Sequence, residues 1–190
     1  MGVLVSNPVR IALAGKKFSG KSTLEKALRH RLELDYSVST ISVAQPLKEG
    51  LHRMGVRTDG PYKDAQAMQD IGDYFRRRNP YWWINLLLED INWTIDYYPA
   101  QAVIVSDVRY PNEAVRLRER GFRLVRLHVI RKQQDQRAHE RGEVFTDAIA
   151  SHPSETALDG YGDYDLILGH DRTPEQQLAS VMRLINSEGR

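Results

Sequence analysis

The sequence predicts an α/β fold in which helices cover both faces of a parallel β-sheet. Two observations carry this prediction. Short apolar runs, bounded by glycine, proline or charged residues, recur along the 190 residues, as expected for buried strands. Segments with apolar side chains at helical spacing alternate with these runs, which is typical of strand–helix–strand units. At this length we expect one domain.

The predicted strands are short and rich in branched apolar residues. The first ends in the glycine of a possible turn, and the third ends at an acidic residue, Asp107. The fourth alternates apolar with basic side chains. In chain order the predicted strands span residues 9–14, 38–43, 102–106, 123–130 and 165–168.

The predicted helices combine apolar stripes with recognisable end signals. Asn112 is expected to cap one helix, with Gly121 just past its end, and Thr173 opens another through a capping box with Gln176. Residues 131–160 are polar and show little periodicity. In chain order the predicted helices span residues 21–32, 46–54, 63–78, 81–97 and 112–120, and the last begins at residue 174.

Composition excludes several classes of protein. Lysine and arginine number 27 against 25 acidic residues, which gives a net charge of +2, too balanced for a strong nucleic-acid binder. No apolar run approaches the ~20 residues of a membrane span, and the first residues do not show the charged and apolar regions typical of a signal peptide. The chain has no cysteine, so it has neither disulfides nor thiolate zinc sites. We therefore expect a soluble cytoplasmic protein with no nucleic-acid or membrane partner.

One motif predicts phosphate binding. The segment Gly15-Lys16-Lys17-Phe18-Ser19-Gly20-Lys21-Ser22 fits G-x-x-x-x-G-K-[ST] without mismatch, between a predicted strand and a predicted helix. Its glycines allow backbone N–H groups to converge on phosphate oxygens at a helix N-terminus. Lys21 can reach the β- and γ-phosphates, and Ser22 can offer its hydroxyl to Mg²⁺. The motif therefore predicts a P-loop that binds a nucleotide with Mg²⁺.

A second phosphate-side element is predicted at the end of strand 102–106. Asp107 can hold a Mg²⁺-bound water or orient a substrate, and Arg109, two residues further, can face the same crevice. The alternative is that Asp107 only caps the strand.

The segment from Gln69 to Trp83 concentrates arginine and tryptophan. Planar guanidinium groups suit a bidentate grip on phosphate, and aromatic rings suit stacking on a base. The alternative is a charged helix end followed by core tryptophans. We expect at least one of Arg76, Arg77 and Arg78 to contact a phosphate.

The polar segment 131–155 is expected to be a mobile flap that closes over phosphates. Arg137 and Arg141 are four residues apart, so both would project from one face of a helical flap. The alternative is a solvated loop. His152, before Pro153, is expected to be a surface residue and not a catalytic base.

These residues together resemble the deoxynucleoside monophosphate kinases typical of bacteriophages, over almost the whole chain. Beside the P-loop, the resemblance rests on the closing strand–turn–helix from Asp165 and on four blocks of sequence: Ala44-Gln45-Pro46-Leu47-Lys48, Gln69-x-x-Gly72 with Arg77 and Trp83, Ser106-Asp107-Val108-Arg109-Tyr110-Pro111-Asn112-Glu113, and His152-x-Ser154-Glu155. The chain departs from the family pattern at His170, where asparagine is usual, and at Arg172, where glycine is usual.

The resemblance implies a P-loop NTPase fold with a five-stranded parallel sheet, a helical region that binds the nucleoside monophosphate (NMP), and a lid. Residues 1–190 would form a single P-loop kinase domain, with its core at 8–55, 100–131 and 161–190, the NMP-binding helices at 56–99 and the lid at 131–155. The implied activity is transfer of the γ-phosphoryl group of Mg-ATP to a deoxynucleoside 5′-monophosphate, in the host cytoplasm for a phage-encoded enzyme.

The resemblance also assigns residue roles, with ATP and Mg²⁺ as cofactors. The residues assigned to ATP are Gly15, Lys17, Phe18, Ser19, Gly20, Lys21, Ser22, Thr23 and, stacked on adenine, Arg131. The residues assigned to the acceptor nucleotide are Lys48, Arg77, Trp83, Asp107 and Arg109. The catalytic assignments are Lys21, Asp107, Arg137 and Arg141, and the Mg²⁺ assignments are Ser22 and Asp107.

Two other functions stay open on the sequence. A P-loop kinase of another phosphorylated small molecule, such as phosphomevalonate, also carries an Asp-Val-Arg block. A P-loop switch that binds GTP would need an Asn-Lys-x-Asp motif, and no asparagine in this chain precedes a lysine. The substrates expected are small nucleotides. The tryptophan-rich segment 81–97 can pack against its own core or against a second copy, which leaves a homodimer open.

Overall fold

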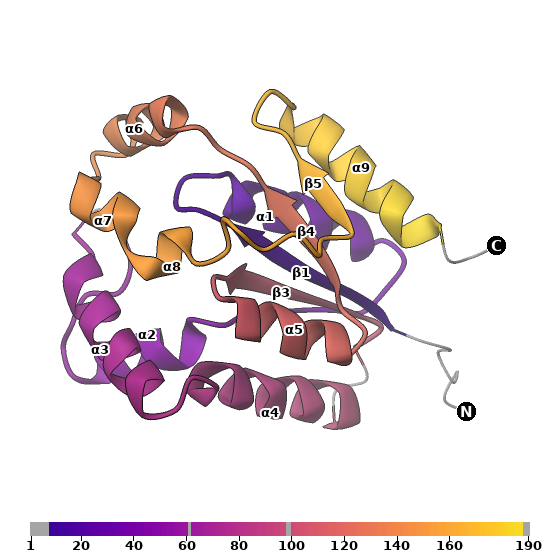
Figure 1. Cartoon of the computed structure of the whole chain (residues 1–190). Coiled ribbons are helices and arrows are strands. Elements are labelled where there is room, and N and C mark those ends of the chain that lie inside the picture. Colours follow the sequence, from indigo (N-terminus) through magenta and orange to yellow (C-terminus); the bar gives the residue numbers. More distant parts are fainter. Residues whose placement is uncertain (1–7, 61, 98–99, 188–190) are drawn as a thin grey trace.

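A computed structural model describes residues 8–60, 62–97 and 100–187. Five parallel strands form one sheet in the order β2-β3-β1-β4-β5, with β1 at its centre (Figure 1). This arrangement confirms the predicted α/β fold class. The strands are β1 (Val9–Gly15), β2 (Val38–Ser42), β3 (Ala102–Val108), β4 (Arg123–Leu127) and β5 (Leu166–Leu168).

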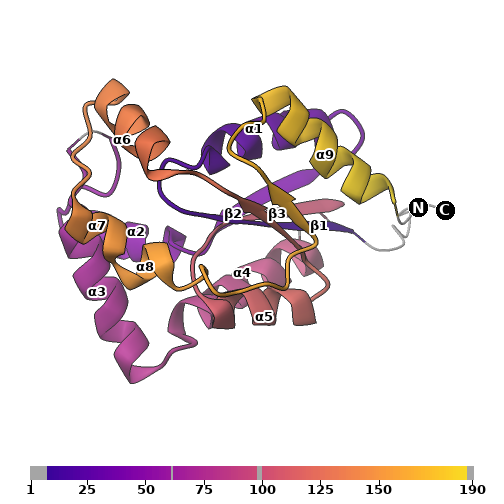
Figure 2. The same ribbon diagram turned by 45° about the horizontal axis from the view of Figure 1, so that its top comes forward.

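Helices cover both faces of the sheet (Figures 1 and 2). One face packs on α1 (Lys21–Leu32) and α9 (Pro174–Asn186), and the other packs on α2 (Gln45–Arg53), α4 (Trp82–Tyr97) and α5 (Pro111–Glu119). Alternation along β1 divides the core, because successive strand side chains point to opposite faces. Ile11 and Leu13 belong to the α1–α9 core, whereas Ala12 and Ala14 belong to the α2–α4–α5 core.

The remaining helices lie beyond the edge of the sheet at which the parallel strands end (Figure 1). They are α3 (Ala65–Arg78), α6 (Arg131–Glu140), α7 (Asp147–Ser151) and α8 (Pro153–Thr156). Ligands of open α/β sheets bind at this edge. None of the helices within the described ranges is both long and apolar enough to cross a membrane.

A β-bulge shapes the end of β3. Ala12 pairs with Val105 and Ala14 with Val108, so two residues of β3, Ser106 and Asp107, lie opposite one residue of β1. Asp107 has a φ of 61°, in the left-handed region. Bulges often redirect a side chain beside an active site. Here the bulge extends β3 two residues past the predicted end, and Asp107 lines a cavity.

Some predicted element ends were correct and others were wrong. The Thr173–Gln176 capping box is confirmed, and so is Gly121 just past α5, with a φ of 77°. Asn112 does not cap α5, which begins one residue earlier. Instead, the carboxylate of Glu113 accepts the backbone N–H groups of Arg109 (2.8 Å) and Tyr110 (3.1 Å), and the Asn112 amide donates to the carbonyl of Pro80.

Two further differences concern residues 123–140. The predicted strand 123–130 ends at Leu127, because its partner β1 ends at Gly15, where the P-loop begins. The polar segment after it forms a helix, α6, despite its lack of an apolar stripe. This helix is held by polar contacts with the P-loop, which are described below.

Candidate active site

A cavity of about 410 Å³ lies between the P-loop, α2, α3 and the segment 141–155. Its walls come from segments that are far apart in the sequence. Residues 17–22 form one wall, residues 43–48 and 58–69 form another, and Asp107 and Arg109 lie at the end of β3. A crevice at this edge of the sheet is where phosphorylated ligands bind in such folds.

The backbone of the P-loop fits a phosphate cradle. Gly15 has a φ of 151°, and a Cβ at that position would lie 2.8 Å from the carbonyl oxygen of Leu127, so no larger residue fits. Gly20 has a φ of 99° and immediately precedes α1. The first N–H groups of a helix are unpaired within the helix and attract anions. The loop can therefore hold the phosphates of a nucleotide.

Lys21 is buried at the base of the P-loop. Its side chain is 7% exposed, and its Nζ donates to the carbonyls of Gly15 (2.5 Å) and Lys16 (2.9 Å). Burial, together with the nearby Arg109, lowers the pKa of Lys21 to about 7, despite the opposing attraction of Asp107. An anion that enters the site would favour the protonated form of Lys21 and raise its pKa again.

Asp107 lies among three cations. Its carboxylate oxygens are 3.8 Å from the Nζ of Lys21, 3.8 Å from the Nζ of Lys48 and 3.5 Å from Nη2 of Arg109, and the Ser42 hydroxyl donates from 3.4 Å. Burial raises the pKa of Asp107, but the cations outweigh burial and bring it to about 2. Asp107 is therefore an ionised carboxylate that can accept a hydrogen bond from a Mg²⁺-bound water.

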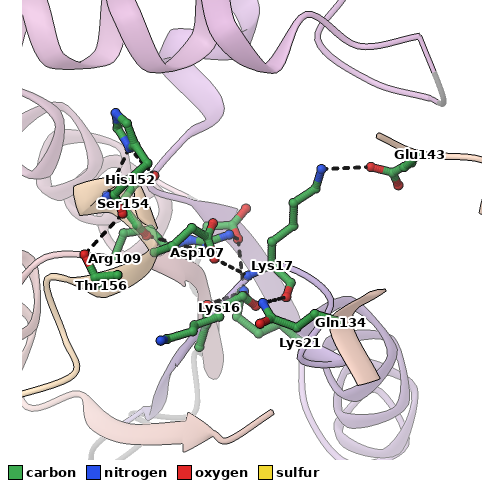
Figure 3. A network of polar contacts seen from close by, with 12 residues as sticks. Lys16, Lys17, Lys21, Asp107, Arg109, Gln134, Glu143, His152, Ser154 and Thr156 are labelled. Carbon is green, nitrogen blue, oxygen red and sulfur yellow. Dashed lines mark hydrogen bonds and ion pairs between the residues drawn. The ribbon is translucent and has the colours of Figure 1, made fainter. Parts of the chain in front are cut away.

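Arg109 joins the end of β3 to α8 (Figure 3). Its Nη1 donates to Oε1 of Glu155 at 2.7 Å, and its Nη2 faces Asp107. Burial lowers the pKa of Arg109, but Glu155 and Asp107 more than offset this effect and raise it. The guanidinium is thus a fixed cation in the cavity wall.

The structure separates the arginines of α3. Arg76 lines the cavity, and its guanidinium lies 4.1 Å from the ring centroid of Tyr110 and 3.6 Å from a carboxylate oxygen of the buried Glu113. Arg77 is exposed and lies outside the cavity wall. Trp83 is buried at the cavity and donates its indole N–H to the carbonyl of Gly72 at 3.0 Å.

The segment 131–155 rests on the P-loop through polar contacts. The amide of Gln134 donates to the carbonyl of Lys17 (2.8 Å), and Nη1 of Arg137 donates to that of Phe18 (2.7 Å). Arg141 lies 5.6 Å from the Phe18 ring centroid and lines the cavity. Arg137 and Arg141 therefore both face the P-loop.

Arg131 lies away from the cavity wall. Its exposed guanidinium pairs with Asp135 (2.7 Å) and Asp147 (2.8 Å) and lies 4.9 Å from the ring centroid of Phe145. Nearby, His170 is exposed, and its ring centroid is 5.6 Å from that of His128.

Most of the site residues predicted from the sequence converge on the cavity. Those in its wall are Lys17, Phe18, Ser19, Gly20, Lys21, Ser22, Lys48, Trp83, Asp107, Arg109 and Arg141. Those outside the wall are Gly15, Thr23, Arg77, Arg131 and Arg137.

Several cavity residues were not singled out from the sequence. Glu143 receives ion pairs from Lys17 (3.2 Å) and Lys63 (2.7 Å), and so joins the segment after α6 to the P-loop (Figure 3). His152 was expected at the surface, but its side chain is 17% exposed, with Nε2 3.2 Å from Asp73. The His152-x-Ser154-Glu155 block was the available signal, although it gave no role to its members.

Comparison with known proteins supports a kinase fold. No protein-family model matches the chain. A protein of Acanthamoeba polyphaga mimivirus named "Putative deoxynucleotide monophosphate kinase" is 25% identical over 205 residues, covering 94% of this chain and 97% of that protein. It is a distant homologue of this chain.

Solved structures of small-molecule kinases have the same fold at 16% sequence identity. A gluconokinase from Sinorhizobium meliloti 1021 gives a TM-score of 0.61 and covers 94% of this chain and 91% of its own. Shikimate kinase from Aquifex aeolicus gives a TM-score of 0.58, with 95% of this chain and 98% of the kinase covered. A sugar kinase from Janibacter sp. HTCC2649 gives 0.63, with 96% of both chains covered. The chain thus shares its fold with small-molecule kinases and carries a P-loop motif between β1 and α1.

Proposed function

We propose that this chain transfers the γ-phosphoryl group of Mg-ATP to the 5′-phosphate of a deoxynucleoside monophosphate. One observation carries the proposal. The cavity has the P-loop on one side; beyond it, Lys48 and Arg109 flank Asp107, and Arg76 lines the same cavity. Three cations facing a phosphate cradle suit an acceptor that is itself a phosphate. The name of the mimivirus relative supports the same activity.

The P-loop supplies the donor side in this proposal. Backbone N–H groups of the loop between Lys17 and Thr23 hold the β- and γ-phosphates, and Lys21 neutralises charge between them. The hydroxyl of Ser22 and the carboxylate of Asp107 would hold Mg²⁺ directly or through water. When bound there, the ion would supply positive charge beside the phosphates. Arg131 would reach adenine only if the nucleotide extends beyond the cavity wall described above.

The acceptor lies between the end of β3 and α3 in this proposal. Arg109, Arg76 and Lys48 grip its phosphate, and Trp83 with Gln69 borders the base. Gly72 makes room for this grip, because a Cβ there would lie 3.0 Å from Nη1 of Arg76. Arg77 was assigned to this role by resemblance, but its exposed position favours Arg76.

The segment 131–155 acts as a lid in this proposal. Arg141 and Arg137 stabilise charge on the transferred group, and the closed lid excludes water that would otherwise accept it. The core (8–55, 100–131 and 161–190), the NMP-binding helices (56–99) and the lid form one kinase domain. The proposed domain, residues 1–190, extends beyond the described residues at both ends and includes residues 61, 98 and 99, which also lie outside them.

One plate of assays tests the proposal. ADP release is measured with Mg-ATP and, in separate wells, each deoxynucleoside and ribonucleoside 5′-monophosphate, phosphomevalonate, gluconate and shikimate. We expect turnover with one or more deoxynucleoside monophosphates, and little with the others. Turnover with phosphomevalonate alone would favour the second kinase class, and turnover with an unphosphorylated alcohol would contradict a phosphate acceptor.

A further inference from the structure

Glu155 connects two parts of the site that are far apart in the sequence. Its carboxylate is 6% exposed. One oxygen, Oε2, accepts the backbone N–H of Lys17 in the P-loop at 2.6 Å, and the other, Oε1, accepts Nη1 of Arg109 at 2.7 Å. A single buried carboxylate therefore spans the proposed donor loop and the proposed acceptor arginine.

The short helix that carries Glu155 is fixed from its other side. Nδ1 of His152 accepts the backbone N–H of Ser154 at 3.2 Å, which caps α8. Nε2 of the same ring lies 3.2 Å from Asp73 on α3. The carboxylate is thus held between α3, the P-loop and the end of β3.

We propose that Glu155 is a positioning residue that sets Arg109 relative to the P-loop and so couples binding of the two substrates. The proposal rests on the function proposed above. A carboxylate oxygen accepts hydrogen bonds but donates none, so each oxygen of Glu155 satisfies one donor. Whichever substrate binds first orders both segments, because they share one partner, and the second substrate then meets a site already ordered.

Glu155→Gln breaks this bridge at almost unchanged volume. The amide has one oxygen that accepts and one NH₂ group that donates. Because Lys17 and Arg109 both donate, the NH₂ group of glutamine would face one of these donors without forming a hydrogen bond. Asp159→Asn is the matched control. Asp159 also pairs with the P-loop, through the side chain of Lys16 at 2.7 Å, but it has no contact with Arg109 and lies outside the cavity wall.

Calorimetry tests the coupling directly. The dissociation constant of the non-hydrolysable Mg–AMP-PNP is measured alone and with the deoxynucleoside monophosphate that the assay panel identifies as the best acceptor. For the wild type and Asp159→Asn we expect about tenfold tighter binding when both ligands are present, within the usual range of coupling. For Glu155→Gln we expect less than about twofold. A Glu155→Gln protein that keeps the wild-type coupling would overturn the proposal.

A second measurement separates this proposal from the proposed function. Hydrogen exchange of residues 15–20 and 153–156 is followed with Mg–AMP-PNP alone. Loss of protection in Glu155→Gln, but not in Asp159→Asn, supports the bridge even if no monophosphate binds the wild type, an outcome that would reject only the proposed function. Equal protection in both variants overturns the bridge. If Glu155→Gln does not fold, Glu155→Asp replaces it, because its side chain is one methylene too short to reach both donors.

Discussion

The ammonium nitrogen of Lys21 lies 3.8 Å from a carboxylate oxygen of Asp107. The two residues come from different elements: Lys21 begins α1, which follows β1 through the P-loop, and Asp107 lies in the bulge at the end of β3. Because β1 and β3 are neighbours, the cation and the carboxylate meet at one point of the cavity wall. Their charges set the electrostatics of the site, and four groups of variants test how.

Lys21→Ala should abolish most turnover and leave the fold intact. Losing one group that stabilises developing charge costs about 3–4 kcal/mol, or some hundredfold to thousandfold in rate. Stability should not fall, because burial already disfavours the charged form of this lysine. ADP release and thermal melting measure the two effects, with Lys26→Ala on the exposed side of α1 as the control. More than about a tenth of normal activity would contradict the catalytic role.

Nucleotide binding should take up a proton above pH 7. The pKa of Lys21 is lowered to about 7 in the free chain, so the side chain is increasingly neutral above that pH. Bound phosphates favour the charged form and raise the pKa again. Calorimetric titration with Mg–AMP-PNP, in buffers of different ionisation enthalpy, measures the uptake. It should vanish below about pH 6, where Lys21 is already charged. In Lys21→Arg the proton uptake that Lys21 causes should be absent, because the arginine guanidinium does not titrate in this range.

The same pKa has a consequence for folding. The unfolded chain holds this lysine at its ordinary pKa of 10.5, so between pH 7 and 10.5 the unfolded state binds more protons than the folded state. The contribution of Lys21 to the free energy of unfolding therefore rises with pH across this window. Denaturant titrations of the wild type and Lys21→Met should diverge there in that direction.

Asp107→Asn should lower the rate by at least about a hundredfold while the chain still folds. Asparagine adopts left-handed backbone more readily than most residues, so the bulge is preserved. Ionised Asp107, with a pKa of about 2, contributes stability that is present above the ordinary value of 3.8 and lost as pH falls through 2. Asp107→Asn should therefore lower the free energy of unfolding near neutral pH by about 2 kcal/mol. Asp107→Ala should melt lower still, because alanine strains at this φ. Normal turnover in Asp107→Asn would leave this residue a structural role only.

Arg76 and Arg77 form a matched pair on α3. Lysine at either position keeps the charge but loses the planar fork that grips a phosphate. Arg76→Lys should raise the Michaelis constant for the monophosphate about tenfold and leave that for ATP nearly unchanged. Arg77→Lys should change neither, because Arg77 is exposed outside the cavity. A raised Michaelis constant for the monophosphate in Arg77→Lys, with none in Arg76→Lys, would show that Arg77 binds the acceptor phosphate.

Arg141→Ala should lower turnover more than it lowers ATP affinity. Arg141 lines the cavity at the end of α6, where it can reach the transferred group. Loss of that contact removes charge stabilisation from the transition state, about tenfold or more in rate. Lys132→Ala, exposed at the start of α6, is the control. Equal effects of the two variants would make segment 131–155 a passive cover.

The sequence was sufficient for the sheet and for the P-loop because both depend on local patterns. A buried parallel strand needs an apolar run, and α1 begins and ends at the predicted residues because the motif fixes its start. Strand ends were less predictable. The ends of β3 and β4 depend on the neighbouring strand β1, and the bulge at Asp107 arises from a register shift that no residue type announces.

The proposed acceptor side of the site was harder to predict for a related reason. Of the three consecutive arginines on α3, Arg76 lines the cavity and the other two do not. Which one does so depends on how the helix is rotated against Tyr110. The carboxylates of Glu143 and Glu155 both contact Lys17 of the P-loop, which lies 126 and 138 residues earlier in the chain (143 − 17 and 155 − 17). Their places follow from tertiary packing, which spacing along the chain does not encode.

The division of the cavity walls among segments has an evolutionary consequence. The wall formed by residues 43–48 and 58–69 is separate from the P-loop and lies in the stretch between β2 and β3. Changes in that stretch can reshape the pocket for a new acceptor and leave the loop, the bulge and α1 untouched. Gluconokinase and shikimate kinase, which share this fold at 16% identity, are named for different acceptors. One scaffold can thus host different substrate sites through exchange of this one stretch.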